Sequence, residues 1–165
     1  MSRPGSSWWA EADRVLAAVL RWGSMLCLAF LLVLLAAGVL VRFAPLFSMG
    51  WADEVVELAF AWMVFLGTAV LWRDGKHISV DFLLQGLGGS PAGRLLALVV
   101  ALLSLGFLAV FTREGWLLTL QAMGNRTPIL ELPRLLWYAA LPVSGLLMIG
   151  YSVRGLWRLV RGRST

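Results

Sequence analysis

Residues 22–41, WGSMLCLAFLLVLLAAGVLV, carry no charged side chain from the first position to the last. A helix needs roughly 20 apolar residues to cross about 30 Å of hydrocarbon, so this stretch is long enough to span a bilayer. Similar charge-free stretches follow at residues 58–72, 95–112 and 135–153. The sequence therefore predicts an all-α integral membrane protein with four tilted transmembrane helices.

The second charge-free stretch is too short to span the membrane unless its helix begins near residue 51. That extension brings Asp53, Glu54 and Glu57 onto or into the membrane. The third stretch continues without proline to residue 123, and such a helix would be about 43 Å long and strongly tilted. We expect spans at residues 22–41, 51–72, 95–123 and 134–154.

Two prolines shape the predicted fourth span. Pro133 is suited to its first turn, where a missing N–H costs nothing. Pro142 lies inside it and removes the donor that would bond the carbonyl of Tyr138, so we expect a kink.

Composition leaves no room for a soluble domain. Of the 165 residues, 60% are apolar and only 14% are charged, which predicts one membrane domain covering residues 1–165. The first stretch is longer than the apolar region of a secretory signal, so we expect it to be retained. The net charge of +5 comes from basic residues beside the apolar stretches, where they set topology, so we expect no nucleic acid partner.

Lysine and arginine are distributed unequally between the two sides of the predicted bundle. Ten lie in the amino-terminal segment, in the loop at 73–94 and in the carboxyl-terminal tail. The other side has four, which are Arg42, Arg113, Arg126 and Arg134. Because positive loops stay in the cytoplasm, we expect both termini to be cytoplasmic.

Two segments outside the spans have the composition of membrane-surface helices. Residues 8–21 are amphipathic at the helical period and either lie in the interface before turning near Gly23 or extend the first span. Residues 77–86 follow a turn signal and are apolar enough to form a short interfacial helix between spans 2 and 3.

Few residues could support catalysis or bind a cofactor. His77 is the single histidine and Cys27 the single cysteine, so the chain has neither paired haem ligands nor a zinc motif. We therefore expect no enzymatic activity, no cofactor and no metal site.

Glu57 is the most unusual ionisable residue, because an ionised carboxylate facing lipid costs a few kcal/mol. Three explanations stay open: an internal pair with Arg42 or Arg113, a contact with another subunit, or a proton-titrating coupling site. A solute path would need polar residues along several spans, and the mid-span positions offer little beyond Thr68, Ser104 and Ser144. We expect that this chain does not transport alone.

The order of several motifs resembles the small membrane subunit, the Q-type (DctQ-like) permease component, of tripartite ATP-independent periplasmic (TRAP) transporters. The match lies in the second span and the loop after it, and again at the entry to the fourth span. Its residues are Asp53, Glu54, Trp62, Phe65, Leu66, Gly67, Arg73, Gly75, His77, Ile78, Val80 and Asp81, then Thr127, Pro128, Leu132, Pro133 and the segment 138–142. Arg134 departs from the pattern, since the family commonly has an apolar residue there.

This resemblance implies a scaffold in a bacterial inner membrane. Its partners would be a large membrane subunit that binds substrate and sodium, a periplasmic substrate-binding protein that delivers an organic acid, and membrane lipid. It suggests Asp53 and Glu54 as periplasmic docking residues. It suggests that a further set of residues has a structural role or lies at the subunit interface, namely Glu57, Trp62, Phe65, Gly67, Arg73, His77 and Asp81.

Two other functions remain compatible with the residues. A self-sufficient, oligomeric, proton-coupled exporter would use Glu57 as its exchange site, although the position of Glu57 near the outer edge of the membrane disfavours this. An interaction-only membrane protein outside any transporter is the weaker alternative.

Overall fold

The computed structural model describes residues 7–43, 49–74 and 91–161. Four helices within these ranges are long and apolar enough to cross a membrane, which confirms the predicted all-α fold. The predicted interfacial helix at 77–86 lies outside the described residues. The elements are α1 (Ser7–Phe43), α2 (Ala52–Arg73), α4 (Pro91–Gln121), a 3₁₀ turn (Ala122–Gly124), α5 (Leu135–Tyr138) and α6 (Ala140–Val160).

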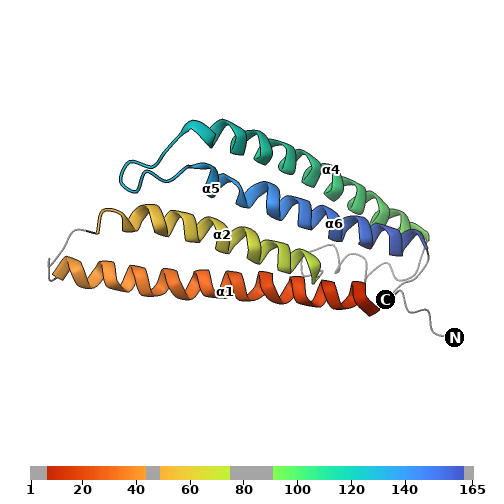
Figure 1. Ribbon diagram of the computed structural model, residues 1–165. Coiled ribbons are helices and arrows are strands. Elements are labelled where there is room, and N and C mark those ends of the chain that lie inside the picture. Colours follow the sequence, from red (N-terminus) through yellow and green to blue (C-terminus); the bar gives the residue numbers. More distant parts are fainter. Residues whose placement is uncertain (1–6, 44–48, 75–90, 162–165) are drawn as a thin grey trace.

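The long helices form a single row in the order α1, α2, α6, α4 (Figure 1). Each helix packs on its neighbour in the row, and among the described helices the backbone of α1 approaches neither α6 nor α4 within 8 Å. A row has two broad faces and little interior. Accordingly, 33% of the apolar window in the last span is buried, against 11% in each of the other three.

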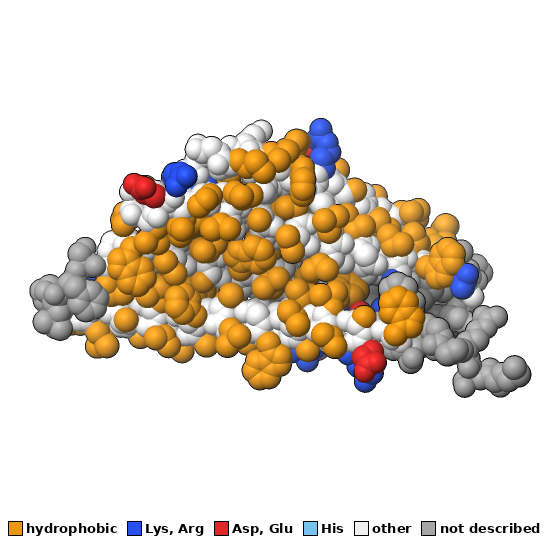
Figure 2. Space-filling view, in the orientation of Figure 1, with side chains coloured by type: hydrophobic (Ala, Val, Ile, Leu, Met, Phe, Trp, Pro, Cys, Tyr) orange, Lys and Arg blue, Asp and Glu red, His pale blue; other side chains and the backbone are white. Residues whose placement is uncertain are grey.

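The buried side chains of α1 show how its sequence directs this packing. Ala17, Leu20, Leu31 and Leu34 are buried, and their spacing places them on one stripe that faces α2. Most of the other described side chains of α1 are exposed, with Leu32 at 71%. Hydrophobic side chains cover most of the face shown in Figure 2 and charged ones lie toward its ends and edges, as expected for a surface that meets lipid or another membrane helix.

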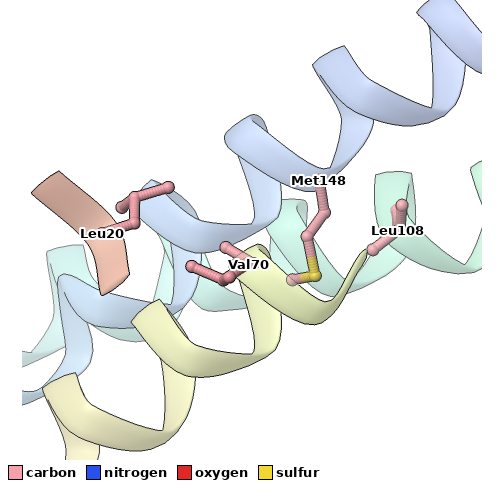
Figure 3. Close-up of a cluster of buried hydrophobic side chains, with 5 residues drawn as sticks. Leu20, Val70, Leu108 and Met148 are labelled. Carbon is pink, nitrogen blue, oxygen red and sulfur yellow. The ribbon is translucent and has the colours of Figure 1, made fainter. Parts of the chain in front are cut away.

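A small core lies where all four long helices contribute a side chain. Leu20 of α1, Val70 of α2, Leu108 of α4 and Met148 of α6 are buried together (Figure 3), and Ala69 is fully inaccessible beside them. This cluster holds the row together near the ends of α1 and α2 that carry the most polar side chains.

The structure decides between the two alternatives for the amino-terminal segment. α1 runs without interruption through Gly23 over 37 residues, so residues 8–21 extend the first span and the expected turn at Gly23 is wrong. At 1.5 Å per residue the helix is about 56 Å long, more than the hydrocarbon thickness. Part of it therefore projects beyond the hydrocarbon unless it tilts strongly.

The expected continuity of the third helix and the expected irregularity near Pro142 in the fourth are both observed. α4 continues through Arg113 and Glu114 without a break, as predicted. The last span is interrupted at Ala139, between α5 and α6, three residues before Pro142. Pro142 has no N–H to donate to the carbonyl of Tyr138, which explains the interruption.

α4 and α6 approach each other closely at two glycines. A Cβ atom added to Gly115 of α4 would lie 2.8 Å from the Cβ of Leu141, and one added to Gly145 of α6 would lie 2.3 Å from the Oγ1 of Thr112. Gly106 and Gly150, on the same two helices, would meet nothing within 4 Å. The two helices therefore depend on the missing side chains at 115 and 145 for their contact.

Candidate functional site

α2 carries most of the residues that the sequence singled out, and it presents them on different faces. Asp53 and Glu57 are exposed, whereas Glu54 is only 8% exposed. Positions 53 and 57 are one helical turn apart and share a face, while position 54 is rotated by about 100° from position 53. The three carboxylates therefore do not act as one cluster.

Glu54 is held by the loop that precedes α5. The loop closes on itself, since the amide of Thr127 donates to the carbonyl of Leu132 at 2.9 Å and the amide of Leu132 donates to the Thr127 hydroxyl at 3.1 Å. This closure directs two amide groups at α2: those of Ile129 and Leu130 donate to the two carboxylate oxygens of Glu54 at 2.8 and 3.0 Å. Glu54 thus joins α2 to the loop.

The structural role of Glu54 was not anticipated from the sequence. Its partners are backbone amides, which have no residue-type signature, so no motif pointed to them. Of the two residues suggested for periplasmic docking, Asp53 is the one whose carboxylate is exposed.

A groove of about 350 Å³ runs between α2 and the last span. Glu57 and Arg134 line it together with apolar and aromatic side chains, and Trp137 contributes an indole N–H that is buried and has no acceptor within the described chain. We call it the lateral groove. Its lining residues are Glu57, Phe60, Ala61, Val64, Phe65, Arg134, Trp137, Tyr138 and Leu141.

The internal ion pair, one of the three explanations left open for Glu57, is not found among the described residues. In the described ranges Glu57 forms no ion pair with Arg42 or Arg113, and Arg113 instead pairs with its neighbour Glu114. An exposed carboxylate in the second turn of a spanning helix is left without a cation inside the described chain.

Trp62, Phe65 and Gly67 are used for packing within the chain. The indole of Trp62 donates to the carbonyl of Leu136 at 3.0 Å, beside the interruption between α5 and α6. The ring of Phe65 lies 6.1 Å, centroid to centroid, from that of Phe111 on α4. A Cβ atom added to Gly67 would lie 4.0 Å from the Cβ of Ser24 on α1, which is an ordinary contact distance.

Arg73 lies in an ion-pair cluster at the end of the row where α1 begins and α6 ends, which we call the terminal end. It donates to Asp13 of α1 at 2.8 Å and to Asp74 at 3.2 Å. Arg154 of α6 reaches Asp13 at 3.3 Å, and Arg21 of α1 reaches Asp74 at 3.4 Å. The cluster therefore joins α1, α2 and α6.

Because its side chains are partly buried, this cluster should contribute more to the stability of the fold than an exposed ion pair would. The side chains of Asp13, Arg73 and Asp74 are about one fifth exposed, so water and salt screen them less. The indole of Trp72 adds a hydrogen bond to the Ser152 hydroxyl at 2.7 Å between α2 and α6. Asp13 and Arg154 were not singled out from the sequence, although both stand among the charges beside apolar stretches.

Two of the suggested site residues, His77 and Asp81, lie outside the described residues. Within the described ranges no group of three or more histidine, cysteine, aspartate or glutamate side chains could hold a metal ion.

These observations define a multi-pass, all-helical membrane protein whose polar residues join its helices and whose lateral faces are apolar. A family model described as tripartite ATP-independent periplasmic transporters, DctQ component, matches residues 31–162. The chain belongs to this family of TRAP transporter small subunits.

Three relatives illustrate the match. The chain is 36% identical over 104 residues to the C4-dicarboxylate TRAP transporter small permease protein DctQ of Rhodobacter capsulatus, covering 59% of this chain and 44% of the relative. The protein of the same name from Pseudomonas aeruginosa is 33% identical over 79 residues, with 47% and 37% covered. A putative TRAP transporter small permease protein of Haemophilus influenzae is 25% identical over 122 residues, with 73% and 74% covered. The chain thus spans less than half the length of the first two relatives.

Proposed function

We propose that this chain is the membrane scaffold of a TRAP transporter and holds a large substrate-translocating subunit in the bacterial inner membrane. The observation that carries the proposal is the single row of helices, which has little interior and two broad apolar faces. In a transporter whose transport domain moves, such a row widens the stationary frame in the bilayer plane. The row offers no polar path of its own among the described spans.

The lateral groove is the proposed contact with the large subunit. Glu57 forms no ion pair and the buried indole N–H of Trp137 has no acceptor within the described chain, and both residues line the groove together with Arg134 and several apolar side chains. A neighbouring membrane helix that supplied a basic and a carbonyl or hydroxyl group would satisfy them. Trp62 supports the groove by holding α2 to α5.

Co-purification with the large subunit tests this contact. Ala61→Trp places an indole in the groove and should reduce the amount of large subunit recovered, and Glu57→Gln should reduce it as well. Ala36→Trp, on an exposed position of α1, is the matched control and should leave recovery unchanged. Full recovery and normal uptake with both groove variants would refute the assignment.

The finer features of transport are part of the same proposal. The names of two relatives specify C4-dicarboxylates, which supports an organic acid as the cargo, and the family resemblance supports coupling to sodium and delivery by a periplasmic binding protein. We assign Asp53 to docking of that protein, with Glu54 acting by holding the adjacent loop. Asp53→Lys should lower uptake at low ionic strength while the membrane complex stays intact.

His77 and Asp81 remain proposed interface residues on the strength of the resemblance. A self-sufficient exporter that uses Glu57 is disfavoured, since Glu57 lies in the second turn of α2, near one end of its span, and not at mid-depth. Reconstitution of the chain alone in vesicles tests this directly, because sodium-driven or proton-driven solute movement without a partner would contradict the scaffold role.

A further inference from the structure

A pocket of about 550 Å³ with several charged and polar side chains in its lining opens at the terminal end, between the ends of α1, α2 and α6. Arg73 and Trp72 line it from α2, Asp13 from α1, and Tyr151 and Arg154 from α6. We call it the terminal pocket. Its position at the end of two spanning helices, Ala52–Arg73 and Leu135–Trp157, places it at the depth of lipid headgroups.

Two buried groups of this pocket are hydrogen-bond donors without acceptors. The Nε of Arg73 and the hydroxyl of Tyr151 are both inaccessible and have no partner among the described residues. Asp13 and Asp74 occupy the terminal nitrogens of Arg73, so the guanidinium is fixed and its remaining N–H has a defined direction. Buried donors in native proteins are normally satisfied, so an external acceptor is the expected complement.

The charge of the pocket specifies what kind of acceptor fits. Among the described residues, two guanidinium groups, those of Arg73 and Arg154, line the pocket together with one carboxylate, that of Asp13. Arg154 is the most accessible of those lining the pocket, with 45% of its side chain exposed. A cation in excess beside two unpaired donors favours an anion with several oxygen acceptors, and arginine is well suited to phosphate.

The apolar surroundings favour an amphiphile over a small free anion. Trp157, one helical turn beyond Arg154 on α6, is 58% exposed, and Trp72 lines the pocket itself. Tryptophan is typical of the level where acyl chains meet headgroups, and basic pockets between spanning helices are known to bind anionic headgroups. Acyl chains can lie along these side chains while the phosphate enters the pocket.

We propose that the terminal pocket binds the phosphate of an anionic phospholipid, such as phosphatidylglycerol, through Arg154, the Nε of Arg73 and the hydroxyl of Tyr151. The site is separate from the lateral groove and does not depend on the large subunit. It would fix the depth and tilt of α1, α2 and α6 at one membrane surface by adding a shared anionic ligand to their ion-pair cluster.

Native mass spectrometry of the purified full chain in mild detergent, titrated with dioleoylphosphatidylglycerol or dioleoylphosphatidylcholine, tests the site. We expect one phosphatidylglycerol to bind more tightly than phosphatidylcholine. Arg154→Gln should weaken this first binding step by about tenfold, the usual size of one charge-assisted hydrogen bond. Arg161→Gln is the matched control, because Arg161 stacks over Trp157 at 4.3 Å and does not line the pocket.

Tyr151→Phe separates binding from folding. It removes a hydroxyl that has no partner within the described chain, so the melting temperature without lipid should not fall, whereas phosphatidylglycerol binding should weaken several-fold. Equal losses with Arg154→Gln and Arg161→Gln, or unchanged binding by Tyr151→Phe, would overturn the site. Displacement of the lipid by an equimolar amount of inorganic phosphate would overturn the lipid assignment and identify free phosphate as the ligand.

Discussion

Gly115→Ala should separate α4 from the rest of the row. The added Cβ would lie 2.8 Å from the Cβ of Leu141, and neither atom can move by rotation of a side chain. Ordinary carbon–carbon contacts are about 3.5–4.0 Å, so the two helices would have to move apart by about 1 Å. α4 is the last helix of the row, and α6 is the long helix that holds it.

The size of the effect follows from two opposing contributions. Overpacking of a tight contact costs about 1–3 kcal/mol. The same substitution at an open helical position stabilises by about 0.5–1 kcal/mol, because alanine loses less backbone entropy than glycine. The second contribution is common to both variants and cancels when they are compared, so Gly115→Ala should be about 1–3 kcal/mol less stable than Gly106→Ala, whose added Cβ meets nothing within 4 Å on the same helix.

Thermal unfolding in detergent, followed by tryptophan fluorescence, measures this difference. For a chain of this size 1 kcal/mol corresponds to about 2–4 °C, so Gly115→Ala should melt about 2–12 °C below Gly106→Ala. Gly150→Ala serves as the open control on α6. Equal melting temperatures for Gly115→Ala and Gly106→Ala would mean that α4 and α6 do not approach at this point.

Three further predictions concern the polar contacts. Glu54→Gln turns one acceptor oxygen into a donor that faces the amides of Ile129 and Leu130. Limited proteolysis should therefore cut the loop at 125–134 faster in this variant than in the parent chain. Cleavage at the parental rate would exclude the contact. Arg73→Gln leaves two partly buried aspartates, Asp13 and Asp74, without their shared cation. It should lower the free energy of unfolding by about 1–2 kcal/mol, as measured by thermal melting. An effect no larger than that of Arg161→Gln would argue against the cluster. Glu131 has a positive φ of 52°, so Glu131→Gly should leave the melting temperature unchanged or raised while Glu131→Val lowers it; the reverse order would contradict this backbone geometry.

The number of spanning helices and the irregularity near Pro142 could be predicted because they depend on local chemistry. An unpaired backbone N–H or C=O group in hydrocarbon is costly. A long charge-free stretch that crosses the bilayer therefore forms an α-helix, in which these groups bond to one another. Proline lacks an N–H wherever it stands, which is why the break at Ala139 followed from the sequence. The path of residues 8–21 could not be predicted, since an amphipathic helix suits both the interface and an extension of a span.

The candidate site was predictable only in part. The motif residues of α2 were identified, but their roles within the chain were not: Trp62 bonds a backbone carbonyl of α5, and Glu54 accepts from two backbone amides of a loop. Asp13 and Arg154 are 141 positions apart, and nothing in local spacing indicates that they meet.

The amino-acid sequence alone was sufficient to show that the chain lies in a bilayer, that it is all-helical and which family it resembles. The reason is that the length of apolar stretches and the order of motifs are properties of the linear chain. The folded arrangement was needed to show that the helices lie in a row, that Glu57 is left unpaired among the described residues while Glu54 is buried, and that three helices meet at the terminal pocket. The physical reason is that lipid is as apolar as leucine, so hydrophobicity inserts the helices without choosing their neighbours. That choice depends on close contacts such as Gly115 with Leu141 and on a few polar bonds between distant residues.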